Sequence, residues 1–552
     1  MTDLSGNDAS ATTDAAPMPE KGLFLLIDSL RFDTMSDPAA RRFMFPNLAR
    51  IVERGFVRRV VANAQSTQFV TPAIFSQTYP LDHGGYDNGI RNRPQSFAES
   101  LQQAGFRTHL LASCNQLGVA TGYGRGFDTV RTTSDFRLLL EQRVDRTIRP
   151  QLDDQRAGKG ERDSETIARE YALLLEGLTE IIEHHDKTVW PPRLLRINNR
   201  VADGCAAELE LLKRDPQAVF AKLARIAPGI QWHFLGERNP RGLRLFVHRA
   251  VESVKWRTRR WIAAQTLWPF LAMSHYPVIF GDIIGPLCRV VEDGRDDRWF
   301  IYMHMMDVHD CRSISRPLHL LARLRYLPRW AIGRLRGYTR RRWLYDTALM
   351  YVDGLLGRLL KTLERTGQLE DTVILATGDH GLYYAESPRA KSQIGSRTHY
   401  EDLEIPLVLA NSHRQPADAG MIDSMSMTAT FLDALGVPAH ESFRGVSVFG
   451  GGKPAIVSES CGRGNADIMH RKIYFTVTSP THKMMATLDG DRLAVEQLYD
   501  KQADPRELRN IVDDPAQCDA IDRLTRYLRA ERAELFALRE AKSASAPERA
   551  TA

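Results

Sequence analysis

Two apolar segments that lie far apart in the sequence both end in an aspartate. The run 22–27 is followed by Asp28, and the run 373–376 is followed by Thr-Gly-Asp379-His380-Gly. Each run has the length and bounding turn residues of a buried strand, and open α/β sheets gather their chemistry at the carboxyl ends of strands. Carboxylate oxygen and imidazole nitrogen are suitable ligands for zinc or a transition metal. We therefore expect one shared cation, the alternative being that each Asp caps a following helix.

Further apolar strands are expected at 107–112, 299–306 and 405–410, with helices between them. Alternating helices and apolar strands predict an α/β layered sheet. We expect a disordered tail at 1–20, a catalytic domain at 21–450, a smaller α+β subdomain at 451–541 and a second tail at 542–552. The final element of that subdomain is predicted as one charged helix over 518–541.

Composition limits the function classes. The 552 residues are 43% hydrophobic, and 74 basic residues face 68 acidic ones, an excess too small to indicate nucleic acid. Six scattered cysteines without a CxxC pair argue against a disulfide framework or a structural zinc site. The amino terminus lacks the pattern of a signal peptide, and no stretch is long and uncharged enough to span a bilayer. These features predict a cytoplasmic protein.

Residues 136–295 are predicted to be helical and are rich in charged residues, with the basic cluster Lys-Trp-Arg-Thr-Arg-Arg-Trp at 255–261. One interpretation is a solvated lid over the active site. The other is peripheral contact with an anionic membrane or glycan, in which basic residues are attracted to the negative surface and Trp side chains anchor the protein there.

Five segments, in this order, resemble the sulfatase-like branch of the alkaline phosphatase superfamily. They are 28–33, 67–84, 303–309, 377–381 and 399–409, and Leu498-Tyr499-Asp500 with Asp504-Pro505-Arg506-Glu507 is similar to the family's closing signature. The resemblance covers roughly 22–135 and 296–510. It implies an alkaline-phosphatase-like central sheet, mixed and mostly parallel, flanked by helices, with the helical basic insertion and the small C-terminal subdomain added.

By this resemblance Asp28, Asp379 and His380 are the ligands of a divalent cation, which can be Mn, Zn, Mg or Ca. The family nucleophile opens a helix twelve residues before a Tyr-Pro, and here that count reaches Thr67. A helix amino terminus favours an anionic substrate through its free N–H groups and dipole. Thr67 can instead be a simple N-cap, with Ser66 or Thr71 as the competing nucleophiles.

The chain departs from the family pattern at two points. Sulfatases of this branch carry Cys or Ser in a C/S-x-P-S-R motif that is converted to formylglycine, and Thr67 cannot be converted. Ser29 stands where a second Asp ligand is usual, which leaves open one metal or two. Relatives with a Thr nucleophile favour phosphate esters, chiefly diesters or head-group transfer.

Substrate contacts are expected from His309, which matches the histidine of the family's Asp-Pro-His, and from Arg397 or His399 near the position of a basic substrate-binding residue. Asp307 and His304 can instead help to hold a second cation, although for His304 strand alternation favours a place against the core.

The expected function is a metal-dependent hydrolase or transferase of a phosphate ester that uses a Thr nucleophile. The alternatives are a sulfuric ester hydrolase without formylglycine and an inactive relative that binds a glycan or a lipid head group. The expected partner is an anionic ester, with the basic insertion as a peripheral membrane contact.

Overall fold

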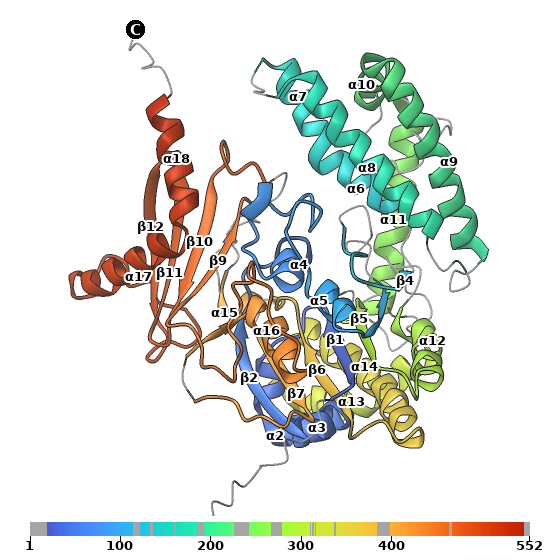
Figure 1. The fold of residues 1–552 in the computed structure, drawn as a ribbon, viewed down its shortest axis with the longest axis vertical. Coiled ribbons are helices and arrows are strands. Elements are labelled where there is room, and N and C mark those ends of the chain that lie inside the picture. Colours follow the sequence, from blue (N-terminus) through green and yellow to red (C-terminus); the bar gives the residue numbers. More distant parts are fainter. Residues whose placement is uncertain are drawn as a thin grey trace, which may run out of the picture.

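The computed structural model describes residues 19–113, 122–132, 136–158, 162–184, 187, 192–225, 242–265, 279–309, 311, 314, 316–335, 338–383, 398–418, 420–462 and 466–545. Its centre is an eight-stranded sheet of order β4-β3-β5-β1-β6-β7-β2-β8 (Figure 1). The strands are β1 (Lys21–Ile27), β2 (Gly55–Val61), β3 (Arg107–Ala112), β4 (Thr129–Thr132), β5 (Trp299–Met305), β6 (Thr372–Thr377), β7 (Glu404–Ala410) and β8 (Ile422–Asp423).

The sheet is mixed but mostly parallel. β1 pairs in parallel with both β5 and β6, whereas β7 runs antiparallel to its neighbours β6 and β2. The expected α/β fold with a mostly parallel sheet is therefore confirmed. β1 occupies an interior position, so the residues at its carboxyl end meet those at the carboxyl ends of β5 and β6.

Alternating residues of β1 face two different cores, as expected for a strand buried on both sides. Leu23, Leu25 and Ile27 belong to one hydrophobic cluster. That cluster includes residues of α3 (Pro46–Glu53), α12 (Phe280–Asp293) and α14 (Arg340–Arg365). Phe24 and Leu26 belong to the second cluster, with α4 (Thr67–Ser76), α5 (Phe97–Gln103) and α16 (Ser424–Ala434).

Between β4 and α12 the chain forms a layer of helices. Its members are α6 (Phe136–Arg143), the π-helical turn η3 (Val144–Ile148), α7 (Arg149–Arg156), α8 (Ser164–His184), α9 (Pro192–Arg214), α10 (Pro216–Arg225) and α11 (Gly242–Gln265). The remaining short helices, α1 (Asp33–Ser36), α2 (Pro38–Met44) and α15 (Tyr400–Leu403), and the longer α13 (Pro317–Leu335) pack around the central sheet.

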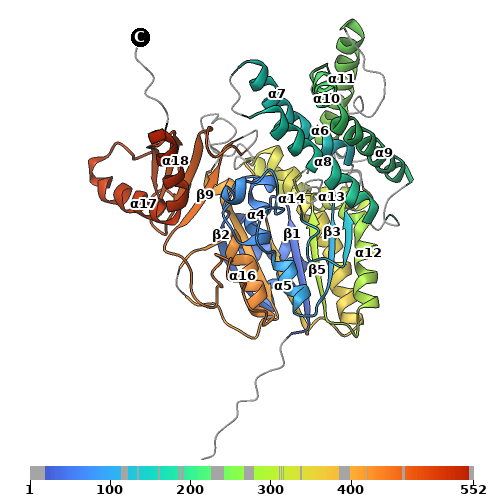
Figure 2. The ribbon, with the colours of Figure 1, turned by 45° about the horizontal axis from the view of Figure 1, so that its top comes forward.

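A second, antiparallel sheet forms the C-terminal subdomain. It has the order β12-β11-β10-β9 and consists of β9 (Ile456–Ser460), β10 (Ile473–Thr478), β11 (His482–Asp489) and β12 (Arg492–Asp500). In both views it lies on the side of α4 opposite to the helical layer (Figures 1 and 2). The α+β character predicted for this region agrees with the structure.

The single helix expected over 518–541 is wrong, because the chain forms α17 (Cys518–Glu531) and α18 (Ala533–Ser545) with a break at Arg532. The Arg532 side chain turns inward, where its Nε lies 2.8 Å from Glu459 Oε2 and its Nη1 lies 2.8 Å from Asp82 Oδ1. A buried ion pair thus sets the position of the break.

None of the helices among the described residues combines the length and apolar character that crossing a bilayer requires.

Candidate metal centre and active site

Asp28 and Asp379 meet because they leave adjacent parallel strands at the same level. Leu26 of β1 is paired with Thr377 of β6, and each Asp comes two residues later. The Ser29 amide donates a 3.0 Å hydrogen bond to Asp379 Oδ1. Both carboxylates are completely buried. The two strand-end carboxylates therefore lie together, as a shared cation would require, and the cation itself stays a prediction.

The turn at Ser29 holds this arrangement. Ser29 has a φ of 65°, in the left-handed region that costs a non-glycine residue about 1–2 kcal/mol. Its hydroxyl donates a 2.6 Å hydrogen bond to Asp28 Oδ1, and the Tyr345 hydroxyl donates a 3.1 Å bond to the Ser29 carbonyl. The strained turn therefore aims the Ser29 amide at one carboxylate and its hydroxyl at the other.

Thr67 is the first residue of α4, and its hydroxyl points into the same site. Thr67 Oγ1 donates a 2.9 Å hydrogen bond to Asp28 Oδ2 and lies 3.3 Å from His380 Nε2. The residue is 4% exposed. The N-cap position belongs to Ser66, whose side chain makes no capping bond, and the Thr71 hydroxyl donates within the helix to the Thr67 carbonyl. Of the three candidate hydroxyls, Thr67 is the one bonded to Asp28.

His380 presents a nitrogen lone pair to this group. Its Nδ1 lies 2.6 Å from the Gly381 carbonyl, an acceptor, so Nδ1 carries the proton and Nε2 in the neutral ring does not. Nε2 lies 3.5 Å from Asp379 Oδ2 and 3.9 Å from Asp28 Oδ1. Burial would lower the pKa of His380, but the carboxylates of Asp379 and Asp28 outweigh it and raise that pKa.

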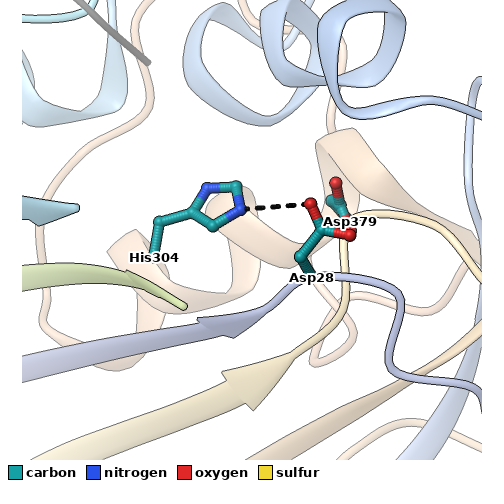
Figure 3. A group of neighbouring side chains, drawn as sticks. All are labelled: Asp28, His304 and Asp379. Carbon is teal, nitrogen blue, oxygen red and sulfur yellow. Dashed lines mark ion pairs between the residues drawn. The ribbon is translucent and has the colours of Figure 1, made fainter. Parts of the chain in front are cut away.

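A second imidazole, His304, approaches the pair from β5 (Figure 3). His304 is paired in register with Leu26, its Nε2 lies 3.7 Å from Asp28 Oδ2, and it is 1% exposed. Neither ring nitrogen has a hydrogen-bond partner among the described residues, and the same holds for Asp379 Oδ2. The ligand atoms of Asp28, His304 and Asp379 lie within 4.8 Å of one another.

His304 is buried, as strand alternation predicts, but its ring points toward Asp28, so the alternative role of a cation ligand stays a prediction. The signal that could have found it is the parallel pairing of β5 with β1, which places its side chain beside the end of β1.

These residues fit a divalent cation. Two buried carboxylates with imidazoles on either side form a donor set for Zn²⁺ or Mn²⁺, and the buried nitrogens of His304 and Oδ2 of Asp379 are otherwise unsatisfied among the described residues. Burial would raise the pKa of Asp28, but His309, His304 and His380 hold it well below its usual range. The carboxylate is thus in its ligating form.

The three predicted substrate contacts are placed differently. His309 is exposed and is the largest of the electrostatic influences that lower the pKa of Asp28, so it lies on the open side of the site. Arg397 lies outside the described residues. His399 donates from Nδ1 to Glu507 Oε2 at 3.0 Å, and it is linked to the metal-site loop through Asp402, whose carbonyl accepts from the Gly381 amide.

A polar cavity opens beside Gln68, the second residue of α4. Gln68 Nε2 donates a 2.9 Å hydrogen bond to Asp87 Oδ1, and Asp87 lines the cavity together with Arg91, Arg143 and Gln151. The buried Gln151 keeps its Oε1 without a hydrogen-bond partner among the described residues. This space lies between the 84–91 loop and the helices α7 and α8, and it is suited to a polar group.

Comparison with known proteins gives the family. A family model described as Sulfatase matches residues 21–185 and 282–437, more than half of the chain. An N-acetylglucosamine-6-O-sulfatase of Bacteroides thetaiotaomicron is 28% identical over 185 residues, 30% of this chain and 31% of that protein. The multifunctional alkaline phosphatase superfamily protein PehA of Trinickia caryophylli is 26% identical over 194 residues, 31% of this chain and 36% of PehA. The similarity thus spans about a third of these relatives.

Solved structures share the fold. The phosphonate monoester hydrolase of Agrobacterium radiobacter has a TM-score of 0.52 at 13% identity, covering 94% of this chain and 96% of its own. The yidJ protein of Bacteroides fragilis has a TM-score of 0.53 at 12% identity, covering 96% and 98%. The alkaline-phosphatase-like architecture expected from the sequence is therefore confirmed.

Proposed function

The chain belongs to the sulfatase family, and from that premise we propose that it is a metal-dependent hydrolase or transferase of a phosphate diester with Thr67 as its nucleophile. One observation carries the proposal: of the three candidate nucleophiles Ser66, Thr67 and Thr71, Thr67 is the one whose hydroxyl is hydrogen-bonded to Asp28, beside the cluster of carboxylates and imidazoles.

The residues around Thr67 orient its attack. The hydroxyl proton is directed to Asp28 Oδ2, so the oxygen lone pairs face away from that carboxylate. The amino terminus of α4 adds backbone N–H groups and a positive dipole end where the anionic ester would sit. Asp28 Oδ2, which accepts the hydrogen bond from Thr67, is positioned to take the hydroxyl proton, and His380 Nε2 lies 3.3 Å from Oγ1.

Asp28, Asp379 and one or both of His304 and His380 would hold the metal ion. When bound, a divalent cation would lower the pKa of the Thr67 hydroxyl and neutralise charge on the transferred group.

The proposed reaction has two displacements at phosphorus. In the first, a Thr67 Oγ–P bond forms while the P–O bond to the leaving alcohol breaks, and the alcohol takes up a proton. In the second, a water or alcohol oxygen bonds to phosphorus while the Oγ–P bond breaks, which restores the Thr67 hydroxyl. Exposed His309 lies on the open side, where it can contact the anionic oxygens.

The choice of phosphate over sulfate rests on the nucleophile. A sulfated formylglycine hydrate keeps a second hydroxyl on the same carbon that can expel sulfate, and an unmodified Thr has none. A phosphorylated Thr can instead be released by direct attack on phosphorus. The second candidate, sulfuric ester hydrolysis, is favoured by the similarity to an N-acetylglucosamine-6-O-sulfatase.

We further infer that the polar cavity beside Gln68 takes the non-reacting part of the substrate. Its lining includes Arg91, Arg143 and Arg162 against Asp87 and Glu170. An excess of guanidinium groups among hydrogen-bonding side chains suits an anionic or hydroxyl-rich group, such as a sugar or a head group.

The test is a substrate comparison with the full chain, stripped by chelator and reloaded with Mn²⁺, Zn²⁺, Mg²⁺ or Ca²⁺. We expect metal-dependent release of p-nitrophenol from bis-p-nitrophenyl phosphate, with slower release from p-nitrophenyl phosphate and p-nitrophenyl sulfate. A preference for the sulfate would establish the second candidate instead. Metal binding without turnover of all three would indicate a binding protein.

A further inference from the structure

Helix α11 carries apolar side chains into solvent along most of its length. The largest are Leu243 (77% exposed), Phe246 (70%), Val254 (64%) and Trp261 (61%), joined by Val247 and Val251. In Figure 2 the helix lies at the top of the view, in the layer of helices with α9 and α10. Large apolar groups exposed together on one element usually indicate an interaction surface.

These side chains form one stripe. At 100° per residue, Leu243, Phe246, Val247, Val251, Val254 and Trp261 fall within an arc of roughly 140°. We call this set the α11 stripe. An apolar arc of this width is typical of a helix face that packs against another surface, yet all six side chains of the stripe are exposed.

The charges of α11 identify the partner. The helix contains six basic residues, Arg244, Arg249, Lys255, Arg257, Arg259 and Arg260, against the single acidic residue Glu252. On the helical wheel Arg244 and Lys255 lie roughly 20–40° beyond one edge of the stripe, Arg249 lies about 60° beyond the other edge, and Arg257 falls within the arc. The stripe, which holds a Trp, is thus flanked by basic residues on both sides.

We propose that α11 binds parallel to the surface of an anionic lipid bilayer, with the α11 stripe in the acyl boundary and the flanking Arg and Lys side chains at the head groups. Interfacial helices combine an apolar face with basic edges and aromatic anchors in this way. A second copy of the chain fits less well, because two α11 helices packed face to face would bring like charges together. The surface is separate from the Thr67 site.

The test is co-flotation of the full chain with vesicles. One set is pure phosphatidylcholine, and the other contains 30% phosphatidylglycerol. The apolar variant is Leu243→Ser/Phe246→Ser, and the charge variant is Arg244→Gln/Lys255→Gln/Arg257→Gln. The matched control is Leu321→Ser/Ile332→Ser on α13, another basic helix with exposed apolar residues. Equal thermal unfolding midpoints would show that the variants are folded.

We expect wild type and the control to bind anionic vesicles at 50 mM salt, at least tenfold more strongly than neutral ones, and to lose binding at 500 mM salt. Each α11 variant should bind at least tenfold more weakly. The proposal is overturned if wild type does not bind at 50 mM salt, or if only the α13 control loses binding. It is also overturned if light scattering shows a wild-type dimer that the apolar variant converts to a monomer.

Discussion

Asp28 and Asp379 are completely buried, and no Arg or Lys of the described chain forms an ion pair with either. Keeping two adjacent buried carboxylates ionised costs free energy when only imidazoles compensate their charge. A bound cation would remove that cost, and the arrangement therefore indicates a site whose stability depends on its ion.

This leads to a prediction for Asp379→Asn. Without metal the variant should be at least as stable as wild type, since one of two like charges is gone. Added Mn²⁺ or Zn²⁺ should stabilise wild type by about 2.7 kcal/mol at a hundredfold excess over Kd and should leave the variant unchanged. Thermal unfolding with and without chelator measures both effects, and an equal metal-induced shift in the two proteins would refute the assignment.

His304 is predicted to be a ligand. His304→Gln should weaken metal binding by at least about tenfold, as measured by titrating stripped protein with Zn²⁺ in a calorimeter. His109→Gln is the matched control, because His109 is also a buried strand histidine, on β3 beside β5, but outside the cluster. Equal affinities for wild type and His304→Gln would assign the imidazole ligand to His380 alone.

At the residue scale, site residues just beyond the end of a strand can be predicted from the sequence more readily than those inside a strand. Asp28, Asp379 and His380 could be grouped because two apolar runs ended in them. His304 could not, because the face on which a strand residue lies depends on strand pairing. The bond between His399 and Glu507 joins residues over a hundred positions apart and has no local signal.

At the scale of elements, the apolar runs predicted β1, β3, β5, β6 and β7 nearly to the residue. The prediction of one long helix after residue 518 was wrong. The break at Arg532 accompanies ion pairs with Glu459 and Asp82, and such tertiary contacts cannot be predicted from helical periodicity. Arg532 is 3% exposed and also lies 4.4 Å from the Tyr79 ring centroid, so it joins the C-terminal subdomain to the 79–82 segment.

Arg532→Met is therefore expected to lower the free energy of unfolding by about 3–5 kcal/mol, because it leaves the buried Glu459 and the half-buried Asp82 without their cationic partner. Arg529→Met, three residues earlier, removes a solvent-exposed pair with Glu540 and should cost less than about 1 kcal/mol. Urea unfolding of the two variants measures the difference. Equal losses of unfolding free energy in the two variants would mean that Arg532 does not hold the subdomain in place.

At the scale of the whole molecule, Glu507 connects the closing signature to the site. It accepts hydrogen bonds from His399 Nδ1, the Tyr400 amide and the buried Lys483. Burial would raise the pKa of Glu507, but Lys483 and His399 outweigh it and lower the pKa from 4.5 to about 2. A lowered carboxyl pKa stabilises the fold above pH 4.5, and this contribution is lost as the pH falls toward 2.

Glu507→Gln should then lose about 3 kcal/mol of stability at pH 7, and its difference from wild type should shrink steadily between about pH 4.5 and pH 3. Urea unfolding across this range measures the effect. Glu441→Gln, at an exposed position, is the control and should behave like wild type throughout. A difference that is constant with pH would show that the Glu507 charge does not contribute.

The central claim is that Thr67 forms the bond to phosphorus, and the most direct measurement is acid quenching during turnover of bis-p-nitrophenyl phosphate, followed by peptide mass spectrometry. We predict a p-nitrophenyl phosphoryl group on Thr67 in wild type and on the serine of Thr67→Ser. Thr67→Ala should carry none and should lose turnover at least about a thousandfold while still binding metal. An adduct on Ser66 or Thr71, or turnover by Thr67→Ala near the wild-type rate, would contradict the account.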